Sequence, residues 1–213
     1  MLPLHSVVMR PAEENNRKVP GARQRLMRSA AKMFQSHGYF AVSTAALLED
    51  AKTPRGSLYH HFPSGKSELA IVTLDWLVEE IITALRSARN WAGGAGEIIP
   101  KLPVNVADWL EVNDWSQGSL LSVLAQETAE TAPEIYEAVQ NAYRLILSEL
   151  ADLIEAEGRP RAVSERLAHI TLSLLEGATT IARTERKRTA LDHASNLLAD
   201  LITVRSQKDA PNA

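Results

Sequence analysis

Apolar residues recur at three- and four-residue steps along most of this chain, and this period constrains the fold more than any other feature of the sequence. The steps are clear in residues 22–37, in 66–91 and throughout 161–205. No segment alternates apolar and polar residues as a half-buried β-strand does, and no internal repeat is visible. The pattern therefore predicts an all-α protein.

Glycine, proline and short polar runs divide this pattern into separate helices. Gly38 is placed to end the first helix, which begins after Gly21. Ser43 or Thr44 can cap a short second helix that runs to Ala51. Later helices are expected at residues 66–91, 116–129, 132–157, 161–186 and 189–205, with a loop at 92–97, an unassigned stretch at 97–115 and a break at 157–160.

The stretch TPRGSLYHHF, residues 53–62, carries the breakers Pro54 and Gly56 inside an otherwise helical pattern. Thr53 is a plausible N-cap, and proline is well tolerated at the first position of a helix. We therefore predict a third short helix that begins at Pro54 and ends before Pro63.

Composition limits the class of protein. With 213 residues, of which 45% are hydrophobic, the chain can bury a substantial core. It has no cysteine, which excludes disulfides and thiolate metal sites. No apolar run approaches the ~20 residues of a transmembrane helix, and the N-terminal stretch lacks the apolar core of a signal peptide. We expect a cytoplasmic protein.

The net charge of −3 hides an uneven distribution. Residues 1–66 contain ten Lys/Arg and four Asp/Glu, whereas residues 67–213 contain thirteen and twenty-two. A basic N-terminal part on an acidic body suggests that the N-terminal part meets a polyanion. The alternative is a flexible basic tail without a specific partner, and charge alone does not separate the two.

Two short helices joined by a brief turn, after a longer helix, predict a helix-turn-helix unit. In such a unit the second helix enters the major groove of DNA and the first braces it. Arg55 can donate a bidentate pair of hydrogen bonds to guanine, and Gly56 leaves room where the helix presses against the groove wall. Leu58 and Phe62, four residues apart, are predicted to point inward and hold the unit together.

Other polar residues of this stretch suit the DNA backbone. Tyr59, His60 and His61 can contact phosphate oxygens, and Ser57 can donate or accept a hydrogen bond. Lys66 lies in the first turn of the next helix, where exposed backbone N–H groups favour an anion. The two histidines have no third ligand at a metal spacing, so we expect neither a metal nor another cofactor.

The stretch STAALLEDAKTPRGSLYHHFPSGKSEL, residues 43–69, resembles the DNA-binding signature of the tetracycline-repressor (TetR) family, and RGSLYHHFPSGK is most similar to its LmrA/YxaF-like subgroup. The similarity covers about residues 22–74, and beyond them only the architecture matches. The family pattern implies phosphate contacts from Thr44, Tyr59, His60, His61 and Lys66, and base contacts from Arg55, Gly56, Ser57 and Tyr59.

Lys52 departs from the family pattern, which usually has glycine after the alanine of the turn. A lysine at this position must take a strained backbone or a different turn. Its side chain is also placed to add a phosphate contact.

The resemblance and the charge pattern together imply a division of the chain by function. The expected segments are a flexible arm at 1–20, the helix-turn-helix domain at 21–66, an effector-binding and dimerisation domain at 67–205, and a disordered tail at 206–213. In the third segment, a pocket within residues 72–176 is expected to take a small hydrophobic effector, with aromatic compounds among the candidates. Its candidate lining residues are Trp76, Trp115, Leu124, Tyr143 and Leu172.

The last two helices carry apolar stripes with small residues between them. Two such helices from each of two chains predict a four-helix dimer interface, which the resemblance also implies. Candidate interface residues are Leu167, Ile170, Leu174, Gly177, Ala178, Ile181, Leu198 and Leu201. The alternative is that the stripe forms only the core of one chain. A two-fold dimer would require a palindromic operator in double-stranded DNA.

These features favour a ligand-responsive transcriptional repressor. Within the same class, a regulator that activates has an identical sequence signature, because the sign of regulation depends on where the operator lies. A helical enzyme or a ligand carrier is the alternative from another class. The chain has no G-x-S-x-G elbow, no phosphate-binding glycine loop and no H-E-x-x-H pair, so an enzyme is not expected. A carrier would not need the basic helix-turn-helix unit.

Overall fold

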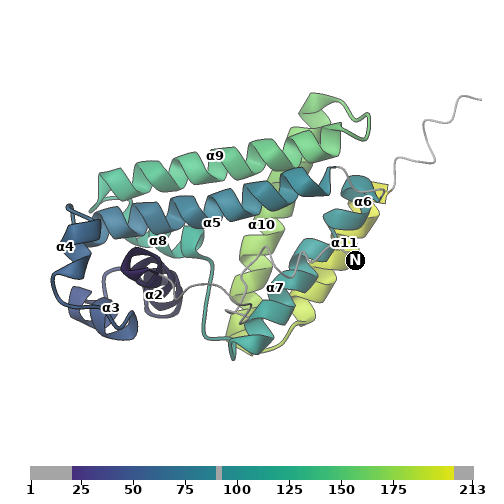
Figure 1. Ribbon diagram of the computed structural model, residues 1–213. Coiled ribbons are helices and arrows are strands. Elements are labelled where there is room, and N and C mark those ends of the chain that lie inside the picture. The colour runs from purple at the N-terminus through teal and green to yellow at the C-terminus, as the bar shows by residue number, and fades with distance from the viewer. Residues whose placement is uncertain (1–20, 90–92, 204–213) are drawn as a thin grey trace, which may run out of the picture. The chain divides into compact units, whose positions relative to one another are not determined.

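The computed structural model describes residues 21–89 and 93–203, and all regular structure in those ranges is α-helical. The all-α prediction is confirmed. Figure 1 labels the helices, which are α2 (Ala22–His37), α3 (Thr44–Asp50), α4 (Ser57–His61), α5 (Lys66–Ala88), α6 (Gly94–Ile98), α7 (Lys101–Val112), α8 (Leu120–Thr128), α9 (Pro133–Glu155), α10 (Arg161–Glu185) and α11 (Thr189–Thr203). The predicted arm, the last two residues of the helix expected at 66–91 and the predicted tail lie outside the described residues.

The helices form two compact units, which we call the head unit and the bundle unit. The head unit contains the described residues up to Glu80 together with 116–144, and the bundle unit contains 81–115 and 145–203. These units do not follow the functional boundary expected after residue 66, because α8 packs against α2 and so belongs to the head unit. No helix among the described residues is both long and apolar enough to cross a membrane.

In the head unit, α2, α3 and α4 pack against one another (Figure 1). Their shared core contains Leu26, Phe34, Leu47, Leu58 and Phe62, each with no exposed surface. The helix α4 has five residues, far below the ~12–15 that an isolated helix needs. Burial of a large apolar side chain contributes about 1.5–3 kcal/mol, so this core holds α4 in place.

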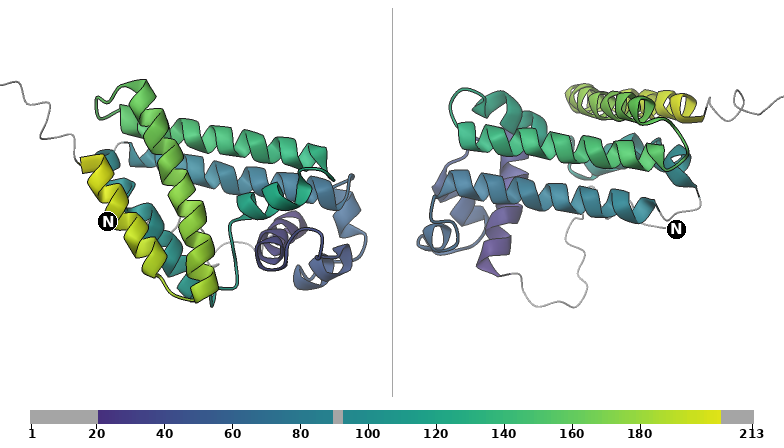
Figure 2. Two further views of the ribbon diagram at one scale, coloured as in Figure 1. Left: turned by 180° about the vertical axis from the view of Figure 1, so that it is seen from behind. Right: turned by 90° about the horizontal axis from the view of Figure 1, so that it is seen from above.

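In the bundle unit, α7, α10 and α11 pack against one another, and Figure 2 shows α10 and α11 from two sides. The centre of this unit is a cluster of small and large apolar side chains from all three helices, namely Ala107, Trp109, Leu110, Ala178, Ala182, Leu191 and Ala194. Alanines from α10 and α11 let the helices approach closely, and the α7 side chains fill the remaining space.

Two stretches of the bundle unit differ from the prediction. The expected loop at 92–97 contains α6, because Ala95 and Ile98 are fully buried and α6 packs against α11. The unassigned stretch at 97–115 contains α7, with Pro100 as N-cap and Pro103 in the first turn. A proline there removes no intrahelical hydrogen bond, so the two prolines start this helix rather than break it.

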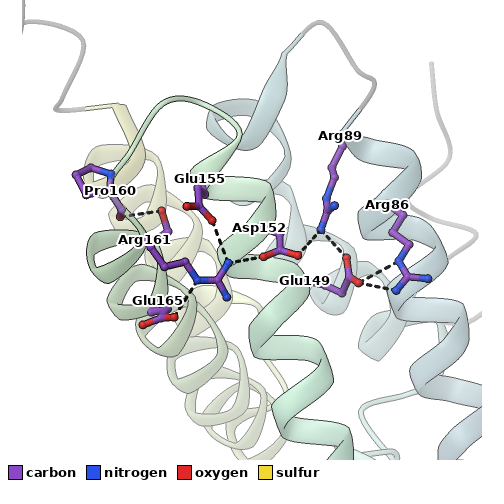
Figure 3. A network of polar contacts seen from close by, with 9 residues as sticks. Arg86, Arg89, Glu149, Asp152, Glu155, Pro160, Arg161 and Glu165 are labelled. Carbon is purple, nitrogen blue, oxygen red and sulfur yellow. Dashed lines mark hydrogen bonds and ion pairs between the residues drawn. The ribbon is translucent and has the colours of Figure 1, made fainter.

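A chain of ion pairs joins the end of α5, the end of α9 and the start of α10 (Figure 3). Glu149, which is 8% exposed, accepts hydrogen bonds from Arg86 at 2.7 Å and from Arg89 at 2.6 Å. Arg89 also contacts Asp152 at 3.1 Å, and Asp152 in turn pairs with Arg161. Because a buried carboxylate is costly without partners, Glu149 fixes the end of α5 against α9.

Arg161 extends this network along the surface of α10. Its guanidinium contacts Glu155 at 3.0 Å and Glu165 at 2.8 Å as well as Asp152, and these three carboxylates raise its pKa. The same contacts act on Asp152, whose partial burial raises the pKa of its carboxyl while hydrogen bonds from Arg161 and Arg89 lower it to a greater extent. The carboxyl group of Asp152 therefore ionises more readily in the folded protein than an ordinary aspartate does.

Candidate nucleic-acid interface

The first short helix of the predicted helix-turn-helix unit is capped as expected. Ser43 accepts a hydrogen bond from the backbone N–H of Ala46 at 3.1 Å, so α3 begins at Thr44. This is the N-cap arrangement that serine favours, and it confirms one of the two caps considered from the sequence.

The turn after α3 resolves the question raised by Lys52, which has a φ of +50°. The N–H of Thr53 donates to the carbonyl of Leu48 and that of Lys52 donates to Glu49, both at 3.0 Å. This pair of bonds defines the Schellman ending of a helix, which places a left-handed residue where Lys52 stands. A side chain in this conformation costs about 1–2 kcal/mol, so of the two alternatives considered from the sequence the structure shows the strained backbone.

The second short helix begins later than predicted. Thr53 is not its N-cap, since its backbone N–H ends α3 and its hydroxyl lies 3.5 Å from the carbonyl of Leu48. Pro54 begins a turn instead, with its carbonyl accepting the N–H of Ser57 at 2.9 Å. The helix α4 therefore starts at Ser57, with Gly56 as N-cap.

One side of α4 is buried and the other is open. Leu58 and Phe62 have no exposed surface, which confirms that they point inward. Tyr59 is 63% exposed, although it is a large aromatic residue. The predicted contact residues around it are also accessible, with Lys52, Arg55, Gly56 and His60 exposed and with Thr44, Ser57, His61 and Lys66 half-buried.

Gly56 has no structural need to be glycine. Its φ of −73° is one that any residue adopts, and a Cβ atom built on it would meet nothing within 4 Å. Gly56 leaves the exposed start of α4 without a side chain at this position.

The turn between α2 and α3 is held by two side chains from other helices. Lys66, the first residue of α5, donates to the carbonyls of Tyr39 and Val42 at 2.8 Å, and its ammonium lies 4.3 Å from the centre of the Tyr39 ring. Partial burial lowers the pKa of Lys66, and the charge of Glu127 opposes this shift. The sequence motif indicated a phosphate contact for Lys66 but did not indicate this structural role.

Glu127 of α8 holds the same turn from a distance of 87 residues along the chain. Its carboxylate accepts the N–H of Phe40 at 2.9 Å and occupies the place where a side chain on Gly38 would lie. Gly38 has a φ of +88°, so glycine is needed there for both conformation and space. Nothing in the spacing of the sequence connects these two residues.

The candidate effector residues are divided between the two units. Trp76, Leu124 and Tyr143 belong to the head unit, whereas Trp115 and Leu172 belong to the bundle unit. Trp115 packs against the apolar cluster of the bundle unit, and Leu172 is 8% exposed. These two residues are therefore part of the bundle core.

The candidate dimer residues also separate into two groups. Leu167, Ala178 and Leu198 are buried within their own chain, as expected of the alternative in which the stripe forms the core of one chain. The helix α7, whose position the sequence left unassigned, covers Ala178. The other candidates are exposed or partly exposed, namely Ile170, Leu174, Gly177, Ile181 and Leu201.

The outer side of α10 also carries a shallow hollow. It has a volume of about 460 Å³ and is lined by Ala162, Glu165, Arg166, His169 and Ile170. None of the predicted effector residues lines it.

Comparisons with known proteins agree with this arrangement. Residues 26–71 match the family model of bacterial regulatory proteins of the TetR family, and residues 95–197 match that of the C-terminal domain of LmrA/YxaF-like transcriptional regulators. The chain is 24% identical over 181 residues to the HTH-type transcriptional regulator LmrA of Bacillus subtilis, covering 85% of this chain and 96% of LmrA. It is 24% identical over 187 residues to the uncharacterised regulator YxaF of the same organism, covering 88% and 96%.

Solved structures show the same fold. A TetR transcriptional regulator from Legionella pneumophila matches with a TM-score of 0.75 at 22% identity, covering 85% of this chain and 97% of its own. The reduced form of NemR from Escherichia coli matches with a TM-score of 0.73 at 18% identity, covering 86% and 98%. The chain belongs to the TetR family of transcriptional regulators, with a C-terminal domain of the LmrA/YxaF-like type.

Proposed function

We propose that this protein is a repressor that binds a palindromic operator as a homodimer and leaves it when a small hydrophobic effector binds. The observation that carries the proposal is α4 with its flanking residues, where Leu58 and Phe62 are buried while Tyr59 and the preceding Arg55 and Gly56 are exposed. A helix of this kind in a helix-turn-helix unit is suited to the major groove.

Each exposed residue has a proposed role on DNA. Arg55 reads a guanine through two hydrogen bonds, and Gly56 lets the start of α4 approach the bases. Ser57 and Tyr59 lie on the same short helix and reach base edges or phosphates. The remaining phosphate contacts are assigned to Thr44, Lys52, His60, His61 and Lys66, the last through its position in the first turn of α5.

The proposed dimer uses the outer side of α10 and α11. Ile170, Ile181 and Leu197 are 40–51% exposed there, and apolar side chains of this size are common in subunit interfaces. Gly177 lies on the same helix as the first two, and a Cβ atom built on it would meet nothing within 4 Å. The backbone at Gly177 is therefore open to the close approach of a second helix.

The proposed effector site lies in the head unit, near Trp76, Leu124 and Tyr143. Thr73 supports this location because its hydroxyl is fully buried on α5, three residues before Trp76, and has no hydrogen-bond partner among the described residues. Buried hydroxyls usually have a partner, and a ligand would supply one. The candidate residues Trp76 and Leu124 are apolar, which favours an uncharged or weakly polar ligand.

The proposed route from this site to the DNA-binding helices runs through α8 of the same unit. Glu127 of α8 holds the turn that precedes α3 through the N–H of Phe40. A ligand that favours another position of α8 would act on that turn. To release DNA, it must bind the DNA-incompetent arrangement more tightly, and each ~1.4 kcal/mol of preference shifts the equilibrium tenfold.

The experiment is a binding titration with labelled duplex DNA from the region upstream of this protein's own coding sequence. Arg55→Ala should weaken binding by about 1–3 kcal/mol, and affinity should fall steeply with salt. The control is Arg144→Ala, which removes an exposed arginine on α9 of the same unit. Equal affinity of the Arg55→Ala and wild-type proteins would contradict the proposed role of α4.

The effector is tested by adding hydrophobic aromatic compounds to the preformed complex. A compound that quenches tryptophan fluorescence and releases the DNA supports the proposed switch. A compound that binds without releasing DNA contradicts it, as does release by highly charged compounds alone.

A further inference from the structure

The turn of the helix-turn-helix unit holds a lysine in a conformation that normally selects glycine. Lys52 has a φ of +50°, and the two Schellman hydrogen bonds on either side of it are formed. These bonds leave the carbonyls of Ala51 and Lys52 without a partner from α3 itself. Because lysine gains nothing from this conformation on its own, contacts from outside the turn must stabilise it.

Those contacts come from one side of α2. Arg25 donates from Nε to the carbonyl of Ala51 at 3.0 Å and from Nη2 to that of Lys52 at 3.5 Å. The hydroxyl of Ser29, one helical turn later, donates to the carbonyl of Leu47 at 3.3 Å. The guanidinium of Arg25 therefore bridges the two carbonyls at the left-handed residue.

Lys32, at the next turn of α2, completes the row. Its ammonium pairs with Asp50 at 2.9 Å, at the last residue of α3. Partial burial raises the pKa of Asp50, but hydrogen bonds from Lys32 and Ser29 lower it by more, so its pKa lies below the ordinary value. Residues three and four apart face the same side of a helix, so Arg25, Ser29 and Lys32 form one row on α2. Their partners lie between Leu47, in the middle of α3, and Lys52, in the turn after it.

We propose that Arg25 is a positioning residue for DNA recognition, which holds the left-handed turn at Lys52 and thereby places Arg55, two residues before the recognition helix α4. The inference rests on the proposed role of α4 in reading DNA. Arg55 follows Lys52 by three residues, so a change of backbone at Lys52 redirects the chain just before the proposed base contact. Arg25 itself touches protein carbonyls, and its effect on DNA is transmitted through the turn.

The proposal distinguishes Arg25 from a residue that contacts phosphate directly. Removing a phosphate contact lowers the slope of log affinity against log salt by about one. Removing a positioning residue weakens binding without changing that slope. The comparison uses the full-length protein, the same upstream duplex and a series of salt concentrations.

The central variant is Arg25→Ala, made in the wild-type protein and in the Lys52→Gly background. Glycine adopts the left-handed conformation without a steric cost, so the turn no longer depends on Arg25 there. We expect Arg25→Ala to weaken operator binding about tenfold in the wild-type protein and by a clearly smaller factor in the Lys52→Gly background, with an unchanged salt slope in both. An equal loss in both backgrounds, or a reduced slope, would overturn the proposal in favour of a direct phosphate contact.

A measurement without DNA separates this inference from the proposed function. Hydrogen exchange of the Lys52 and Thr53 amides reports the two bonds of the turn. Arg25→Ala should accelerate both amides, and Lys52→Gly should restore their protection. Arg28→Ala, which removes the same charge from an exposed position on α2, should leave them unchanged.

The two measurements together locate any failure. We call the contacts of Arg25 with the carbonyls of Ala51 and Lys52 the clamp. If Arg25→Ala leaves the exchange of the Lys52 and Thr53 amides unchanged, the clamp is refuted, whether or not the protein binds the chosen DNA. Accelerated exchange with full operator affinity shows that the clamp does not position α4. Failure of the wild-type protein to bind any duplex, with accelerated exchange in Arg25→Ala, refutes the proposed function and leaves a purely structural clamp.

Discussion

The residue Gly56 illustrates how a missing side chain can indicate a partner. It stands at the start of α4 with an ordinary helical φ and open space around it. Its backbone conformation and its surroundings within the chain would both accept alanine. The fold does not require this glycine, and the proposed approach of α4 to DNA supplies a reason for it.

This reading makes a prediction for Gly56→Ala. The substitution should stabilise the free protein by about 0.4–1 kcal/mol, because alanine has fewer unfolded conformations to lose. It should also weaken operator binding by about 1–3 kcal/mol, because the added methyl group meets the groove wall. Thermal unfolding and a DNA titration measure the two effects, and unchanged DNA affinity would show that α4 does not press its start against DNA.

A second residue prediction concerns Asp152 in the ion network. Its pKa is lower in the folded protein than its ordinary value of 3.8. A group of this kind stabilises the fold above its unfolded pKa, and the contribution disappears as pH falls through the folded pKa. At acid pH, the free energy of unfolding should therefore no longer be larger with Asp152 than with a neutral residue at this position.

The test compares melting temperatures of wild-type and Asp152→Asn proteins at pH 7 and at pH values below 3.8. We expect the variant to melt about 2–4 °C lower at pH 7, since a partly exposed network is screened by solvent. The difference should shrink in acid. Asp200→Asn, an exposed carboxylate on α11 outside the network, serves as the control. A difference that persists at the lowest pH would assign the effect to packing rather than to charge.

At the scale of helices, the sequence predicted the long elements well, because strong apolar periodicity and clear breakers mark their ends. The break at 157–160 lies between α9 and α10 as expected. The errors occur where contacts between residues distant in sequence determine whether a helix forms or where it begins. The helix α6 forms because α11 covers it, and α4 starts late because Thr53 is used to end α3.

The candidate sites show the same limit. The α4 residues could be chosen from the motif, since they are close in sequence and their exposure follows the helical period. Contacts such as Glu127 with Phe40 join residues far apart and leave no trace in local spacing. The contacts of Arg25, Ser29 and Lys32 with α3 and the turn after it also join residues distant in sequence.

The exposed apolar residues of α10 and α11 lead to a prediction for the dimer. Ile181 is 51% exposed, so Ile181→Glu places a charge on the surface of one chain without entering its core. In the proposed interface that charge would be buried and unpaired, which strongly destabilises association. Sedimentation velocity should show a shift from dimer to monomer.

The control for this prediction is Leu145→Glu, the same kind of change at a residue of α9 that is 40% exposed. It should remain dimeric. If Ile181→Glu remains dimeric while the protein stays folded, the interface lies on another surface.

The whole molecule contains a basic helix-turn-helix unit and, in α10 and α11, helices that are proposed to pair two chains. Two recognition helices related by a two-fold axis would read two half-sites of opposite orientation. In this proposal, the base sequence of each half-site depends on α4, and the inverted repetition of the half-sites depends on the dimer.

The most direct test is selection of binding sites from a pool of random-sequence duplexes by the wild-type protein. The account predicts an inverted repeat whose half-sites each contain a conserved guanine, and loss of preference at that guanine when the selection is repeated with Arg55→Ala. Enrichment of a single unrepeated site, or of no sequence at all, would contradict it.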